Sequence, residues 1–197
     1  MTDASDIDKA EYDNLRAESL FHQTNASAIF GLNMVGMGVG ITASGKIDAA
    51  LLVLAVISCV LWLRYCDHLI TIFRIAAYLH RHLRPRLLAR LGEPVLNWEN
   101  FLRSAEPDDS SRMPRLPSAD SRIGFIVASL GFMLPPPLLC AAFLTQRWNS
   151  EQGTTWTPLV LATSLALLMW VYSMGRGYRV MRWIRATDRW ISGGAQA

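Results

Sequence analysis

The chain has 197 residues, of which 51% are hydrophobic and only 18% are charged, and its formal net charge is +3. This composition excludes an average soluble domain, in which about a quarter of the residues are charged. The length excludes more than one compact unit.

The first 25 residues are acidic, with six Asp or Glu residues against two basic residues. Apolar residues recur among them at Ile7, Leu15 and Leu20, a pattern that favours an amphipathic helix over residues 4–25. We expect residues 1–25 to form a helix that lies in the cytosol.

Residues 26–66 are expected to form a first hairpin of membrane-spanning helices. No charged residue occurs over residues 19–45, which exceeds the roughly 20 apolar residues that a helix needs to cross a bilayer. The apolar block at 49–63 is shorter, and we expect it to span with help from Ile47 and the snorkelling stem of Arg64. The two spans are predicted near residues 26–45 and 47–66.

Polar and small residues in this hairpin are candidates for a pore or gate. Asn33 needs a partner in protein or water, because an unpaired amide in hydrocarbon is costly. Gly36 and Gly40 form a G-x-x-x-G pair, which permits close approach of a helix from the same chain or from another copy. Arg64 ends the second apolar block. The alternative interpretation is ordinary helix packing with interhelical hydrogen bonds.

Residues 67–122 are expected to be a cytosolic helical extension followed by a linker, with an amphipathic helix that runs on from the second span, from about residue 47 to 83. Pro85 is its first stop signal, followed by Gly92 and Pro94. Beyond them, the stretch 104–121 has the Pro/Ser/Asp composition of a loose linker.

A second hairpin is predicted over residues 123–175. Residues 123–146 and 152–175 contain no Asp, Glu, Lys or Arg, and each stretch is long enough to cross a bilayer. The two spans are predicted near residues 123–145 and 157–175.

Three consecutive prolines, Pro135, Pro136 and Pro137, interrupt the third span. Each removes a backbone donor, and its ring clashes with the carbonyl four residues earlier, so a regular helix cannot pass through unchanged. The carbonyls freed near residues 131–133 need partners from protein or a water-filled cavity. A kink or broken helix near mid-membrane is therefore predicted, either as a gate or as a purely structural bend.

The C-terminal segment, residues 176–197, is predicted to be a basic juxtamembrane helix. Its arginines recur at steps of three, three, three and four residues, which we interpret as a stripe down one side. We expect the stripe to contact anionic lipid; nucleic acid or nucleotide phosphate, and the acidic N-terminal helix, are the alternative partners. The candidate residues are Arg176, Arg179, Arg182, Arg185 and Arg189.

The basic residues also predict the topology. Of the nineteen Lys and Arg residues, all but Lys46 and Arg147 lie in the N-terminal segment, in residues 64–122 or in the C-terminal segment. The positive-inside rule then places both termini in the cytosol. The predicted fold class is all-α, a polytopic membrane protein with four transmembrane helices and cytosolic amphipathic helical extensions.

Catalytic motifs are missing from the sequence. It contains no G-x-S-x-G, H-E-x-x-H, P-loop or glycine-rich dinucleotide fingerprint. The Asp67–His68 and His80/His82 arrangements are weak candidates, because residues one or two apart on a helix do not face each other. We expect no enzyme, with no catalytic residue, metal or cofactor.

The order of the sequence motifs carries a resemblance. "EYDNLRAESLFHQTNASAIFGLNMVGMGVGI" is followed by "LWLRYC", then by "FRIAAYLHRHLRPRL" and "LNWENFL", over roughly residues 11–102. This order resembles a group of small bacterial membrane proteins of unknown or defensive role, and it is also similar to the channel-like membrane effectors of Hailong anti-phage systems. The resemblance implies an oligomeric channel in the bacterial inner membrane, controlled by single-stranded DNA oligomers that a partner nucleotidyltransferase makes. It assigns no ligand-binding residue to this chain.

Two functions are therefore predicted as alternatives. The first is a homo-oligomeric gated pore in the lipid bilayer, with an anti-phage role and an anionic nucleotide or single-stranded DNA signal. The second is a non-catalytic membrane anchor or adaptor subunit for a cytosolic partner.

Overall fold

The computed structural model describes residues 4–44, 49–91, 119–149 and 156–193. All of these residues except Leu134 are helical, and no strand occurs among them. The predicted all-α fold is therefore confirmed for the described part of the chain.

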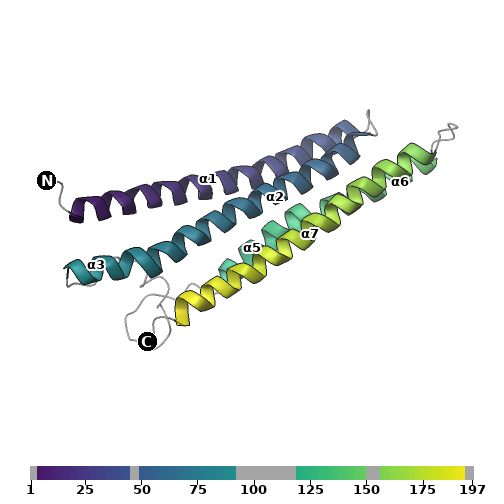
Figure 1. The fold of residues 1–197 in the computed structure, drawn as a ribbon. Helices are drawn as coiled ribbons and strands as arrows, with labels where there is room; N and C mark the ends of the chain where they lie inside the picture. The colour runs from purple at the N-terminus through teal and green to yellow at the C-terminus, as the bar shows by residue number, and fades with distance from the viewer. Residues whose placement is uncertain (1–3, 45–48, 92–118, 150–155, 194–197) are drawn as a thin grey trace.

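Long helices form two antiparallel pairs in the described ranges (Figure 1). The first helix begins and the last helix ends at the same end of the molecule (Figure 1). The elements in chain order are α1 (Ala4–Ser44), α2 (Ala49–Tyr78), the π-helical turn η1 (Leu79–Leu83), α3 (Arg84–Leu91), α5 (Ala119–Met133), α6 (Pro135–Asn149) and α7 (Trp156–Gly193).

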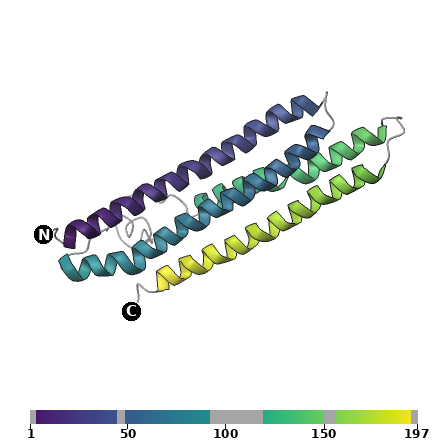
Figure 2. The same cartoon turned by 45° about the horizontal axis from the view of Figure 1, so that its top comes forward.

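Helix α2 lies at the centre of the bundle. It packs against α1 on one side and against α5, α6 and α7 on the other (Figure 2). Apolar clusters follow one another along it, and the middle cluster contains Trp62 and Cys66 of α2 with Phe132, Val180 and Ile184. This cluster surrounds the end of α5, where the prolines begin.

Single helices cross the expected boundaries between cytosolic and membrane segments. Helix α1 runs unbroken through residues 25 and 26, so the N-terminal helix and the first predicted span are one element. The residues change from polar to apolar near this boundary, which changes the preferred environment of the helix from water to lipid. No proline occurs there, so the helical backbone is not broken. In the same way, α2 continues past residue 66 and α7 continues past residue 175.

The prediction that Pro85 stops the second long helix is wrong. The Arg84 N–H donates to the carbonyl of Leu79, five residues earlier, which is the π-helical pattern. Pro85 then lies in the first turn of α3, where a missing N–H is tolerated. The helix continues to Leu91. The later stop signals and the predicted linker lie outside the described residues.

Membrane-spanning character is present in three helical stretches of the described residues. Each is long and apolar enough to cross a bilayer, and together they correspond to the second, third and fourth predicted spans. The first predicted span, 26–45, ends outside the described residues and stays a prediction. The three candidate spans are Ala49–Arg90, Phe125–Arg147 and Pro158–Thr187.

Candidate functional site at the proline break

The predicted break in the third span is present and lies at Leu134. Helix α5 ends at Met133, α6 begins at Pro135, and Leu134 forms a bend between them. The Leu134 N–H still donates to the Leu130 carbonyl at 3.0 Å, so helical bonding is intact up to this residue. The three prolines follow directly, and the carbonyls four residues before them lose their helical donors.

Side chains from three other helices donate to the freed carbonyls. Each bond joins one donor on α1, α2 or α7 to one carbonyl: Asn33 Nδ2 to Gly131 at 3.0 Å, Ser58 Oγ to Phe132 at 3.2 Å, and Trp170 Nε1 to Met133 at 2.8 Å. Each carbonyl therefore has one substitute partner, and all three partners are protein groups. The prediction that the freed carbonyls need such partners is confirmed.

Two of the three donors are buried. Asn33 is 2% exposed and Ser58 is fully buried. A buried carbonyl that loses its only donor costs about 1–3 kcal/mol. The second amide atom of Asn33, Oδ1, is buried and has no hydrogen-bond partner among the described residues. The break therefore has one spare acceptor beside the three carbonyls.

Aromatic rings fix the end of α5. Phe132 is fully buried, and the ring centroids of Trp62 and Tyr65 each lie 5.4 Å from its own. The Trp62 Nε1–H donates to the Ser173 carbonyl of α7 at 3.1 Å. Its ring lies against Gly177 of the same helix. Trp62 and Ser58, both on α2, therefore connect α7 to the broken helix.

No protein-family model, curated protein or solved structure matches this chain. The resemblance to Hailong effectors therefore stays a prediction.

The other pore candidates are dispersed. Gly40 lies against the Leu54 side chain of α2, so half of the G-x-x-x-G pair packs within the chain. A Cβ at Gly36 would meet nothing within 4 Å, so that half is open to approach. Arg64 is exposed on α2. Among the pore candidates of the first hairpin, Asn33 contacts the break.

The C-terminal arginines do not form one stripe. At 100° per residue, three steps of three turn the helix by half a circle, so Arg176 and Arg185 lie on opposite faces of α7. Arg176 pairs with Asp67 of α2 at 3.5 Å, whereas Arg185 and Arg182 line a cavity beside α5. Arg179 is exposed and donates to the Gly175 carbonyl at 3.3 Å. Arg189 belongs to α7, and its side chain lies outside the described part of the structure.

Two acidic residues of α1, Asp8 and Glu11, pair with arginines of α3. Asp8 is 2% exposed and forms ion pairs with Arg86 and Arg90 of α3. Glu11 pairs with Arg86 and accepts a hydrogen bond from the Tyr78 hydroxyl. The sequence analysis did not identify these partners, because it ended the second long helix at Pro85, whereas the helix continues through α3 beside the start of α1.

The residues weighed for catalysis also have structural partners. His68 shares a 2.7 Å hydrogen bond with His22 of α1, and Asp67 pairs with Arg176. The described residues contain no group of three His, Cys, Asp or Glu side chains that could hold a metal ion.

Proposed function

We propose that copies of this chain assemble into a gated membrane channel, and that the proline break is the gate. The break supports this proposal because its three backbone oxygens depend on side chains of three other helices. Broken helices occur in membrane proteins where they are buried in protein or line a cavity. A rearrangement of these helices would exchange protein donors for water.

The chemistry of the break suits a path for ions. Rings of carbonyl oxygens can replace the hydration shell of a cation in a filter. Opening would present the carbonyls of residues 131–133, together with Asn33 Oδ1, to a water-filled lumen. In the described structure the carbonyls are held by protein donors, which we assign to the closed state.

Exposed apolar surface supports assembly of several copies. In the most apolar stretch of each candidate span only 33%, 28% and 17% of the residues are buried, so lipid or other copies must cover the rest. On α1, Leu32, Val35 and Val39 are at least 60% exposed. Gly31 and Gly38 lie among them, and a Cβ at either glycine would meet nothing within 4 Å, which leaves room for close approach of another helix.

The packing of α1 supports a fourth span and cytosolic termini. Helix α1 runs antiparallel to α2, and Gly40 contacts Leu54, within the apolar block of α2. The apolar half of α1 therefore lies at the depth of that block. The start of α1 and the end of α7 share one end of the bundle (Figure 1), where the positive-inside rule places the cytosol.

The proposed signal is anionic and acts on the cytosolic end. Arg179, Arg182 and Arg185 are exposed there, and guanidinium groups bind phosphates. With the resemblance to Hailong effectors, this supports single-stranded DNA oligomers from a nucleotidyltransferase partner as the ligand, and an anti-phage channel in the bacterial inner membrane as the function.

A membrane anchor or adaptor subunit is the second candidate. The ion pairs between Asp8 and α3 fasten the cytosolic ends of α1 and α2 together, which favours a rigid surface for a partner protein. This function requires no ion flux.

Ion flux from proteoliposomes separates the two functions. We expect liposomes containing the purified protein to pass ions in a way that short single-stranded DNA changes, whereas empty liposomes do not. Double-stranded DNA of the same sequence, added in the same assay, tests whether the ligand must be single-stranded. If flux equals that of empty liposomes with and without DNA, the channel proposal is wrong and the adaptor function is favoured.

A further inference from the structure

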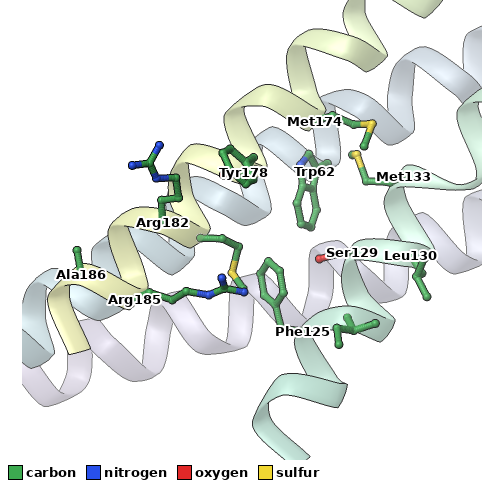
Figure 3. Close-up of a pocket in the computed structure, with 13 residues that line it drawn as sticks. Trp62, Phe125, Ser129, Leu130, Met133, Met174, Tyr178, Arg182, Arg185 and Ala186 are labelled. Carbon is green, nitrogen blue, oxygen red and sulfur yellow. The ribbon is translucent and has the colours of Figure 1, made fainter. Parts of the chain in front are cut away.

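A cavity of about 670 Å³ lies between α5 and α7, on the cytosolic side of the break. One face of each helix forms a wall, and the Trp62 indole of α2 lies between them (Figure 3). Its size is within the roughly 300–1,000 Å³ that is typical of small-molecule sites. The cavity is therefore large enough to hold a ligand.

The lining of this cavity is amphipathic. Phe125, Leu130, Met133 and Met174 supply apolar surface around Trp62. At the other end the lining includes Arg182 and Arg185. Figure 3 shows Arg185 reaching from α7 across the cavity toward Phe125 of α5. A ligand that is apolar over most of its length and anionic at one end matches this lining, which is apolar around Trp62 and basic at the other end.

One polar atom in the wall has no partner. The hydroxyl oxygen of Ser129 is buried and makes no hydrogen bond to any described residue. It belongs to the α5 wall of the cavity, among the apolar lining residues (Figure 3). Buried hydroxyl groups normally have a partner, so a ligand oxygen at this position would satisfy it.

The position of the cavity identifies the source of such a ligand. Its α5 wall starts at Phe125, near the start of the uncharged stretch 123–146. Its α7 wall runs from Met174, at the end of the uncharged stretch 152–175, to Ala186. The basic end therefore lies where the apolar spans meet the aqueous boundary, which is the depth of lipid headgroups.

We infer that this cavity binds an acidic phospholipid, with an acyl chain against Trp62, Phe125 and Met133 and the phosphate on Arg185. The Ser129 hydroxyl donates to an ester or phosphate oxygen of the same lipid. The site adjoins the break at Met133 and includes Arg185, one of the arginines proposed for the anionic signal. Lipid binding itself does not require the proposed channel function.

Native mass spectrometry of the full-length protein tests this site. Detergent-solubilised protein is titrated with phosphatidylglycerol or, as the neutral control, phosphatidylcholine of the same acyl chains. We expect preferential binding of phosphatidylglycerol. Arg185→Gln should weaken the affinity for phosphatidylglycerol by about tenfold, which is the typical effect of losing one charge-assisted hydrogen bond. The matched control is Arg179→Gln, which removes an equal charge from the exposed side of α7 and should retain wild-type binding.

A second variant tests the cavity itself. Ser129→Phe fills the space beside Trp62 and should abolish retention of phosphatidylglycerol in protein whose helix content and elution volume are unchanged. Equal binding of the two lipids, or equal losses in Arg185→Gln and Arg179→Gln, would contradict the inference. Displacement of the lipid by inorganic phosphate alone would identify a free anion as the ligand, and a smaller oligomer in Ser129→Phe would identify a second copy of the chain; either result would overturn the lipid site.

Discussion

The Asn33→Leu variant is expected to lose about 1–2 kcal/mol of stability, and Pro135→Ala in the same chain is expected to recover most of that loss. Leucine preserves the size of the side chain but leaves the Gly131 carbonyl without its donor. The loss of a buried partner costs about 1–3 kcal/mol, although interhelical hydrogen bonds in membranes average nearer 0.6 kcal/mol. Alanine at position 135 restores the backbone N–H that normally bonds the carbonyl four residues earlier.

The pairing of prolines with donors makes this prediction specific. Pro137→Ala should not rescue Asn33→Leu, because the restored N–H would face the Met133 carbonyl, which Trp170 already bonds. Reversible unfolding in mixed micelles, evaluated as a double-mutant cycle, measures the coupling energy. Equal coupling of Asn33→Leu to both prolines would contradict the one-to-one replacement of backbone donors by side chains.

Two glycine-to-alanine substitutions on α7 are expected to change stability in opposite directions. A Cβ at Gly177 would lie 2.7 Å from Cζ2 and 2.8 Å from Nε1 of Trp62, whereas a Cβ at Gly175 would meet nothing within 4 Å. The indole is rigid and only 2% exposed, so it cannot move aside without strain. Gly177→Ala should therefore lose about 1–3 kcal/mol, as overpacked cores do.

Gly175→Ala is the matched control. Alanine is favoured over glycine in a helix by about 0.5–1 kcal/mol, so this variant should be more stable than the wild type. Tryptophan fluorescence gives a second readout, because only Gly177→Ala should disturb Trp62 and its hydrogen bond to Ser173. A stabilising effect of both substitutions would show that α7 does not approach α2 at Trp62.

The sequence was sufficient to predict the break but not its partners. Three prolines in an apolar stretch remove three identifiable backbone N–H donors. This follows from the residue type alone and needs no information on tertiary structure. Asn33 was a candidate because an amide in an apolar stretch requires a partner. Ser58 and Trp170 were not identified as donors, since their roles depend on how α2 and α7 rotate against α5.

Other differences have the same physical origin. The π-helical turn before Pro85 depends on local backbone bonding that residue types do not specify. The cavity between α5 and α7 depends on the spacing of two helices that are distant in sequence. The sequence also suggested a single arginine stripe, but the helical geometry and the packing of α7 give its arginines different surroundings.

Ion flux through wild-type protein and a Pro135→Ala/Pro136→Ala/Pro137→Ala variant in matched liposomes tests the central claim most directly. The control is Pro158→Ala, which replaces an exposed proline in the first turn of α7, where a missing N–H is tolerated. We predict that the triple variant has altered flux with unchanged oligomeric size, and that the control behaves like the wild type. Equal flux through all three proteins would contradict the assignment of the proline break as the gate.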